Sequence, residues 1–476
     1  MSALEIHINM TKLKLIFISI IFCSGIYAIP VFLSHTDNNK KLYGNKNSQF
    51  PLFILNRIDS DDSTISSEEL KKEYCSNNLY VLSDLKESLD KLFKCDNKKI
   101  INITSDPGAV LSKIKQNKKV IVDFANIDPL AGTLSVDSIN YFNDPDNYIF
   151  RIESVNPNLK ILAPEKVEIT KISMTGVTAI TRNTGLAADK YGTAFLTEKV
   201  KDEFSDSDFV HISNEVSIFP DCRYNWLRTT KFCTKERDFE AFKDIKVNIV
   251  EITGNHHKDY GEQYYADTCE LYKRHGMKFF GGGRNQIEAE SPLIIKIRNN
   301  KKIGFIGFNE SCSTGECSDN KNQSGANRYN SDKAKSAIKK MKENSRVDFI
   351  IATVQFNEDD SYLPSENQKK ISEFLIDSGA DMVFGSQAHQ VQQVRHYKGK
   401  YIYYGLGNFL FDQVQKTGLR EGMIVHNYFF NGKLVQSIPV FTFISNERRP
   451  VKADSLQIKN IRKNIYNRNL LYNFSE

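Results

Sequence analysis

The chain has 476 residues, of which 40% are hydrophobic, so it is long enough to form two or three domains with cores of their own. Its 64 Lys and Arg against 58 Asp and Glu leave a net charge of +6, a weak excess that gives no reason to expect nucleic acid as a partner.

The N-terminal segment, residues 1–34, is predicted to engage a membrane. Lys12 and Lys14 precede the uncharged run Leu15 to Leu33, which nearly spans a bilayer core of about 30 Å at about 1.5 Å per residue. We expect a signal anchor; a cleavable signal peptide ending near Ala28 is the alternative. A lipoprotein is disfavoured because Phe22 precedes Cys23 where a small residue is expected. The positive flank would send the remaining chain outward.

The cysteines fit an oxidising compartment. Two pairs, Cys222 with Cys233 and Cys312 with Cys317, bracket short loops suited to local disulfides. A zinc site is the weaker alternative because no C-x-x-C motif or nearby His pair is present. In a reducing compartment the cysteines would be small buried apolar residues. At least one must be left over among the seven that follow the apolar run, which are Cys75, Cys95, Cys222, Cys233, Cys269, Cys312 and Cys317.

Two regions come before the main domain. Residues 35–70 are polar and rich in Asn, Asp and Ser, and we interpret them as a tether with one short strand, PLFIL. Over residues 71–165 helical and strand patterns alternate, which predicts a small α/β lobe. No catalytic constellation is present there, so the lobe is either a binding lobe or a spacer.

Residues 166–445 contain repeated apolar runs followed by polar residues, the pattern of strands that deliver a site at their C-terminal ends. Between the runs Phe349–Val354 and Asp381–Phe384, residues Glu366–Ser378 have helical spacing, with Gly379 as a plausible C-cap. Two late strands, GMIVHNYFF and KLVQSIPVFTFI, are typical of the closing layer of a two-sheet sandwich. Residues 446–476 form a basic amphipathic tail.

The strongest short motif is VNIVEITGNHHKDYG, a buried strand that ends in Asn255, His256 and His257. Amide oxygen and imidazole can both ligate a divalent metal or contact a phosphate, and Gly254 permits the turn. Asp259 could orient one of the histidines.

Two other turns carry candidates. Asn214 and Glu215 follow the strand FVHI. They are expected either to belong to the site or to form a helix cap or turn. The turn GGGRN is expected to be a tight turn rather than a phosphate cradle, because no P-loop lysine follows it. Arg284 in that turn is a plausible anion contact.

The stretch from Val354 to Gln413 resembles the CapA family of capsule, or poly-γ-glutamate, synthesis proteins, whose fold is that of the calcineurin-like metallophosphatases. The resemblance covers 168–444 well and 120–153 weakly. The matching residues, in order, are Pro364, Gln368, Gly379, Ala380, Asp381, Gly385, His389, Gly407, Asn408 and Phe409.

The resemblance implies an α/β fold: a metallophosphatase-type two-sheet sandwich flanked by helices, preceded by the small α/β lobe and the membrane segment. It places Arg182 at a basic position of the family. It also exposes three departures, because Val177 stands at a metal-bridging Asp, and Gln355 and Gln387 stand at histidines.

The residues that remain could hold one divalent metal, Mn or Zn, but not a two-metal centre. The predicted ligands are Glu215, Asn255, His256 and His389. The predicted catalytic residues are Glu215, His256, His389 and Asp359, with Glu358 nearby. The predicted substrate contacts are Arg182, Asn214, Asn255, His257, Asp259, Arg284, Gln355, Gln387 and Asn408.

Three functions follow as hypotheses. The first is a membrane-anchored, extracytoplasmic protein of the bacterial cell envelope that binds an anionic cell-surface polymer or its precursor during synthesis or handling. The second is a hydrolase with one metal or none, in which Glu215 or Asp359 acts as base and His256 or His389 as acid. The third is a non-catalytic scaffold for a membrane synthase.

Overall fold

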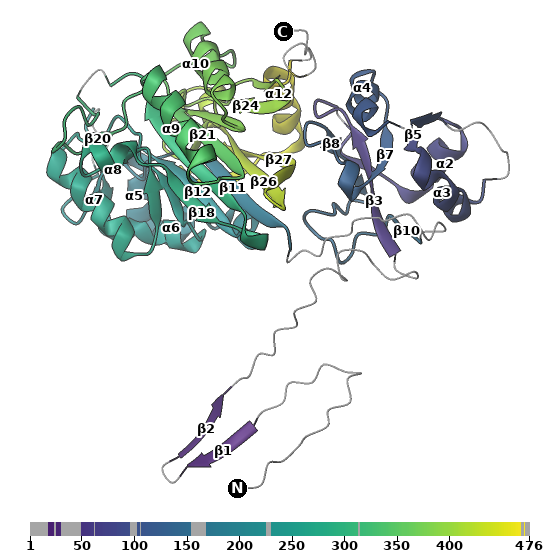
Figure 1. Ribbon diagram of the computed structural model, residues 1–476. Helices are drawn as coiled ribbons and strands as arrows, with labels where there is room; N and C mark the ends of the chain where they lie inside the picture. The colour runs from purple at the N-terminus through teal and green to yellow at the C-terminus, as the bar shows by residue number, and fades with distance from the viewer. Residues whose placement is uncertain are drawn as a thin grey trace.

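The computed structural model describes residues 18–22, 25–29, 49–60, 62–95, 102–104, 106–153, 168–224, 230–312, 315–467 and 471. A small and a large α/β lobe lie side by side (Figure 1). Near the N-terminus, β1 (Ile18–Phe22) and β2 (Gly25–Ile29) pair antiparallel. Among the described helices none has the length and apolarity needed to span a bilayer. The predicted membrane segment otherwise falls on residues outside the described ranges, as does Cys23.

The small lobe is built on a six-stranded sheet in the order β10-β3-β7-β5-β6, with β8 paired to β3. Helices α2 (Ser67–Cys75), α3 (Lys86–Phe93) and α4 (Val110–Lys115) pack on it. The strands are β3 (Gln49–Asn56), β5 (Tyr80–Leu82), β6 (Asn102–Thr104), β7 (Val120–Asp123), β8 (Gly132–Thr133) and β10 (Arg151–Glu153).

The expected tether over residues 35–70 is wrong for its second half. The run PLFIL belongs to β3, which pairs with β7 and β10 inside the sheet. Its side chains are buried in the core of the lobe, and α2 follows with Ser66 as its N-cap. Burial of five consecutive apolar residues outweighs the polar composition of the flanks.

The large lobe is a sandwich of two sheets. One has eight strands in the order β16-β15-β12-β11-β26-β27-β28, with β25 paired to β11, and the other has six in the order β18-β19-β21-β22-β24-β23. Apolar side chains of both sheets form one core between them, including Met174, Ile249, Phe305 and Ile351. The two-sheet α/β architecture expected from the sequence is therefore present.

The first sheet consists of β11 (Thr170–Thr178), β12 (Phe209–Asn214), β15 (Ile249–Glu251), β16 (Lys278–Phe280), β25 (Asn408–Leu410), β26 (Glu421–Phe430), β27 (Lys433–Ile444) and β28 (Pro450–Lys452). The second consists of β18 (Leu293–Lys296), β19 (Lys302–Asn309), β21 (Phe349–Gln355), β22 (Met382–Ser386), β23 (Val394–Tyr397) and β24 (Lys400–Tyr403).

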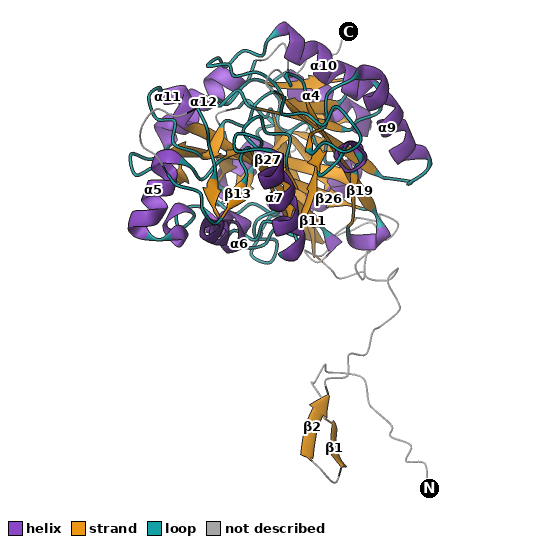
Figure 2. Cartoon of the chain, turned by 90° about the vertical axis from the view of Figure 1, so that its left-hand side faces the viewer, coloured by secondary structure: helices purple, strands orange, loops and turns teal. Residues whose placement is uncertain are grey.

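Helices surround the sandwich, as the view in Figure 2 shows. The predicted helix over 366–378 is α10 (Glu366–Asp377), whose N-cap Ser365 and Gln368 form a capping box. The other helices of this lobe are α5 (Arg182–Tyr191), α6 (Glu240–Asp244), α7 (Glu262–Arg274), α8 (Gln286–Glu290), α9 (Ser331–Glu343), α11 (Thr417–Arg420) and α12 (Ser455–Ile465).

The C-terminal segment ties the two lobes together. The predicted basic tail supplies β28, which pairs with β27, and α12, whose Ile461 and Ile465 are buried in the sandwich core. From α12, Arg462 donates a hydrogen bond of 2.7 Å to the Ile58 carbonyl of the small lobe. Aromatic contacts such as Phe124 on Phe430 continue the same seam.

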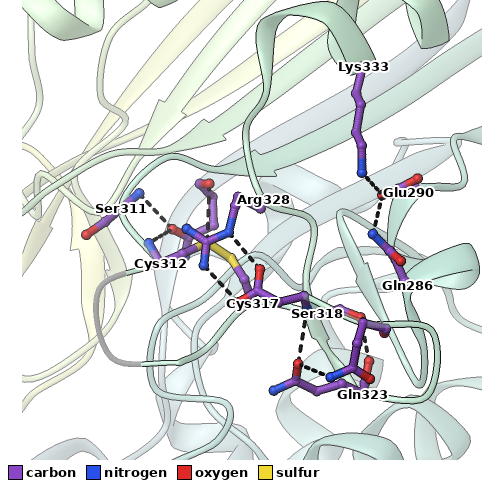
Figure 3. A network of polar contacts seen from close by, with 12 residues as sticks. Gln286, Glu290, Ser311, Cys312, Cys317, Ser318, Gln323, Arg328 and Lys333 are labelled. Atoms are coloured by element: carbon purple, nitrogen blue, oxygen red, sulfur yellow. Dashed lines mark hydrogen bonds and ion pairs between the residues drawn. A yellow bond between two sulfur atoms is a disulfide. The ribbon is translucent and has the colours of Figure 1, made fainter.

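Three disulfides lie in the described part of the chain. Cys222–Cys233 and Cys312–Cys317 form as predicted, and Cys75–Cys95 is a third pair that spacing did not suggest. Cys269 is free and buried. Figure 3 shows the Cys312–Cys317 disulfide with Arg328 beside it. The Cys312–Cys317 loop leads into β20 (Gly325–Ala326), which pairs with β17 (Gly282–Gly283).

Candidate functional site

The site lies where parallel strands of the two sheets end on the same side of the sandwich. The hydrogen bond from Gln355 Nε2 to Asn255 Oδ1, 3.1 Å long, joins the end of β21 to the loop after β15. His389, in the loop after β22, places Nε2 3.8 Å from Oε1 of Glu215, which follows β12. The structure thus brings together four predicted residues that are far apart in the sequence.

His389 is held in one orientation. Its Nδ1 donates to Asn408 Oδ1 at 2.8 Å, and the amide nitrogen of Asn408 donates to the Leu419 carbonyl. Nε2 therefore faces Glu215 and Glu358, whose Oε1 is 3.7 Å away. Burial lowers the pKa of His389, but the charges of Glu215 and Glu358 and the hydrogen bond to Asn408 outweigh it, so this pKa is raised above its ordinary value.

Glu215 is a buried carboxylate with unused hydrogen-bonding capacity. It is 3% exposed, and neither of its carboxylate oxygens makes a hydrogen bond within the described part of the chain. It therefore does not act as a side-chain cap. Gly254 permits the close approach of the His256 loop, because a Cβ there would lie 2.4 Å from the Glu215 Cα. A buried carboxylate of this kind is suited to a ligand or a cation.

His256 is the second imidazole of the site, and Asp259 orients it as predicted. Its Nδ1 lies 2.7 Å from Asp259 Oδ2, which also accepts a hydrogen bond from the Phe232 backbone. Burial lowers the pKa of His256. The hydrogen bond to Asp259 and the charges of Asp259 and Glu215 raise this pKa by more than burial lowers it, so the net shift is upward. The ring also packs on Phe232 at 4.3 Å.

Two predicted substrate contacts are instead bound into the scaffold. His257 is buried against Tyr265, and its Nε2 donates to the Asn214 carbonyl at 2.9 Å. Burial lowers the pKa of His257 to about 3, so the ring is neutral. The Asn214 amide donates to the Val216 carbonyl and to Tyr272 Oη. The two neighbouring rings thus have different surroundings, and only His256 joins the site.

Arg284 is also outside the site. Its guanidinium binds Glu288 at 2.8 and 2.9 Å and also pairs with Glu270 on α7. The predicted tight turn at GGGRN is not what forms, because Gly282 and Gly283 are strand β17, paired with β20. Gly281 before it has a φ of +76°, and a Cβ at Gly282 would lie 1.9 Å from Tyr265 Oη.

Arg182 and Asp359 differ in their relation to the site. Arg182 lies at its margin, bound to Asp412 and packed between Phe232 and Phe411 at 4.6 and 5.0 Å. Asp359 has no contact with either site histidine among the described residues. The neighbouring Glu358 lies near His389 instead, and a catalytic role for Asp359 stays a prediction.

The three departures from the family pattern shape the cleft. Val177 is buried and its amide donates to the Gly407 carbonyl, so an apolar side chain stands where the family has a carboxylate. Gln387 is buried, and neither atom of its amide has a partner in the described ranges. Gln387 and His389 have φ values of +75° and +56°. Two such residues in one loop hold strain of about 1–3 kcal/mol each, a feature of functional sites.

Whether the site can hold a metal ion depends on the carboxylate, imidazole and amide groups described above. Within the described residues no group of three or more His, Cys, Asp or Glu side chains could hold an ion. Of the predicted ligands, Glu215 and His389 lie 3.8 Å apart. By the resemblance to the family, Val177 stands where two metals would need a bridging carboxylate. A two-metal centre therefore does not fit. One Mn or Zn ion would depend on Glu215 and His389 with amide oxygens such as that of Asn255, and it stays a prediction.

The sequence did not predict the residues that hold the site side chains in position. Phe232, Phe411 and Asp412 hold Arg182 and the two histidine rings in place. Phe411 and Asp412 directly follow the strand that contains Asn408, and this position at a strand end was the available signal.

Together these features define a two-sheet α/β sandwich with a cleft of histidine, glutamate and amide side chains at the strand ends. A family model described as "Bacterial capsule synthesis protein PGA_cap" matches residues 171–413, about half of the chain, and the chain belongs to this family.

The names of similar proteins agree with this family. The chain is 24% identical over 311 residues to the capsule biosynthesis protein CapA of Bacillus anthracis, covering 64% of this chain and 74% of that protein. It is 24% identical to the PGA biosynthesis protein CapA of Bacillus subtilis, covering 48% and 59%. A probable polyglutamine synthesis accessory protein of Mycobacterium tuberculosis is 20% identical, covering 44% and 57%. The chain therefore spans less than two thirds of the length of the B. subtilis and M. tuberculosis proteins.

Solved structures are more distant. The NAD nucleotidase of Haemophilus influenzae is similar with a TM-score of 0.36 and 12% identity, over 62% of this chain and 55% of that one. A putative 5'-nucleotidase of Staphylococcus aureus has a TM-score of 0.34 and 10% identity, over 62% and 58%.

Proposed function

We propose that this protein acts in the synthesis or handling of a capsule-type anionic polymer such as poly-γ-glutamate, and that its cleft binds the polymer or a precursor. The family and the names of the relatives support the pathway. The observation that carries the binding role is the buried amide of Gln387, whose oxygen and nitrogen have no partner among the described residues.

The chemistry of a γ-glutamyl chain matches this cleft. Each repeat has an amide linkage, which both donates and accepts hydrogen bonds, and a free carboxylate. A Gln side chain can satisfy the linkage in both directions, and a buried polar group without a partner costs about 1–3 kcal/mol that a ligand would recover. The two histidines, whose pKa values are raised, would face the carboxylates of the chain.

The proposed setting is the outer side of a bacterial membrane. Lys12 and Lys14 followed by the uncharged run Leu15–Leu33 support an N-terminal anchor. Disulfides are typical of proteins outside the cytoplasm and so support an extracytoplasmic position. A membrane synthase that makes the polymer is the partner such a position suggests.

The test is polymer binding by a variant that only shortens the amide. Asn tolerates a positive φ, so Gln387→Asn is compatible with the loop while it withdraws the amide by one methylene. We expect the Kd for poly-γ-glutamate, measured by isothermal titration calorimetry, to rise about tenfold. Gln263→Asn, on the exposed face of α7, is the matched control and should bind like the wild type. Equal affinity of all three proteins would remove Gln387 from the binding site.

A second candidate function is a hydrolase with one metal ion or none. The observation that favours it is the locked ring of His389, which points Nε2 at a carboxylate that has no hydrogen-bond partner in the described part of the chain. Glu215 would accept a proton from the attacking water and His389 would donate one to the leaving group. A metal ion, when bound, would supply Lewis-acid activation.

Ion binding separates the two candidates. If the hydrolase uses one metal, we expect about one Mn²⁺ or Zn²⁺ to bind per chain by calorimetry, and Glu215→Gln to weaken this binding at least tenfold by removing a charged ligand. Glu251→Gln is the control, because Glu251 is equally buried on β15 but lies by His211 instead. If no ion binds, or both variants bind it equally, Glu215 is not a ligand. If the chain binds neither ion nor polymer, two hypotheses stand: the metal-free hydrolase and the non-catalytic scaffold.

A further inference from the structure

An exposed acidic side chain of the loop after β21 reaches the site histidine. Glu358 places Oε1 3.7 Å from Nε2 of His389, although the Glu358 side chain is 64% exposed and that of His389 only 3%. Glu215 lies 3.8 Å from the same nitrogen and is as buried as the histidine. His389 thus meets one carboxylate that belongs to the interior and a second one that solvent reaches.

Three basic residues of the site act on this exposed carboxylate. Its contact with His389, followed by the charges of His389, His256 and Arg182, lowers the pKa of Glu358 by more than partial burial raises it. The same three residues would stabilise the carboxylate of a bound ligand. The Glu358 carboxylate therefore lies where the site favours a negative charge.

The loop that carries this carboxylate is fixed at both ends. Backbone hydrogen bonds of 3.3 and 2.9 Å hold it at Phe356 and at Tyr362. Between them, no hydrogen bond joins the backbone of residues 357–360 to another backbone group within the described part of the chain. Asp360 pairs with Lys416, and both of these side chains are exposed. The carboxylate can therefore leave the histidine without breaking a backbone hydrogen bond.

We infer that Glu358 is an internal competitor for the site: its carboxylate occupies the place beside His389 that a carboxylate of the polymer takes, and it must move away before the polymer binds. This inference rests on the proposed function. Only molecules in which the place is vacant can bind, so Glu358 reduces the apparent affinity by the vacant fraction. A carboxylate tethered close to its site has an effective concentration on the order of mM, which makes it an effective competitor.

The test is polymer binding by a variant that loses the charge and keeps the shape of the side chain. We expect Glu358→Gln to lower the Kd of the full chain for poly-γ-glutamate about fivefold, measured by isothermal titration calorimetry, which is the upper end for an exposed charge contact. Glu358→Ala should give the same gain. Glu366→Gln removes another exposed charge, at the start of α10, and is the matched control that should bind like the wild type.

Three results would overturn the inference, and they differ in what happens to the proposed function. If the wild type binds the polymer and Glu358→Gln binds it equally or more weakly, Glu358 is not a competitor and the proposed function stands. If Glu366→Gln gains as much as Glu358→Gln, the loss of any negative charge is enough, and the function again stands. If neither the wild type nor Glu358→Gln binds the polymer, the proposed function fails and the inference fails with it.

Discussion

Gly176→Ala is expected to destabilise the large lobe by about 3 kcal/mol or more, near the upper end for overpacking a buried position. A Cβ at Gly176 would lie 2.0 Å from the Gly407 carbonyl oxygen. The backbone fixes the position of a Cβ, and the oxygen is itself a backbone atom, so neither can rotate away. That carbonyl also accepts the Val177 amide hydrogen bond at 2.9 Å. Calorimetry should show Tm lowered by about 5 °C or more.

The same substitution should also weaken the site. Gly407 directly precedes Asn408, which fixes His389, so a displaced β25 would release the histidine. Gly108→Ala is the control, because the added Cβ would meet only the movable side chain of Asp106, at 3.1 Å. It should change stability by less than about 1 kcal/mol. An unchanged Tm for Gly176→Ala would show that β11 and β25 are further apart than described.

The second expected result is a loss of stability in acid that depends on His396. This residue of β23 is buried beside Tyr401, with Lys115 and Asp59 of the small lobe as its charged neighbours. Burial lowers its pKa to about 3. The unfolded chain takes up a proton near pH 6.5, so the stability is complete above that pH and is lost as the pH falls from 6.5 toward 3.

The size of this effect follows from the pKa difference. Each pH unit inside the window costs about 1.4 kcal/mol, so His396 contributes about 2 kcal/mol of the loss between pH 7 and pH 5. His396→Phe keeps an aromatic ring against Tyr401 but cannot titrate. Between pH 7 and pH 5 the unfolding free energy of this variant should therefore fall by about 2 kcal/mol less than that of the wild type. Denaturant unfolding at both pH values measures the difference. His275→Phe, at an exposed histidine, should keep the wild-type pH dependence.

The fold and the location of the site followed from pattern, but the direction of single side chains did not. Apolar runs that end in polar residues predicted the shared edge where Glu215, Gln355 and His389 meet. Helix α10 followed from its spacing and caps. His256 and His257 are equivalent by sequence, yet one enters the site and the other binds the Asn214 carbonyl. Only the exit angle of the chain after β15 decides this.

Two other expectations depended on contacts that composition does not show. Arg284 was expected to contact an anion, but Glu288, four residues later, and Glu270 on α7 bind its guanidinium. The strand at 51–55 appeared isolated in a polar tether because its partner β7 lies about 65 residues away. Local composition reports neither kind of contact.

The three disulfides have a consequence for how the chain matures. Their partners are 20, 11 and 5 residues apart, and each pair lies within one lobe. Each can therefore be oxidised as soon as its own short segment emerges, before any distant part of the polypeptide is available. Mispairing is also limited because Cys269, the free cysteine of the described part of the chain, becomes buried when α7 packs. Correct pairing thus depends on the order of synthesis and needs no search among distant cysteines.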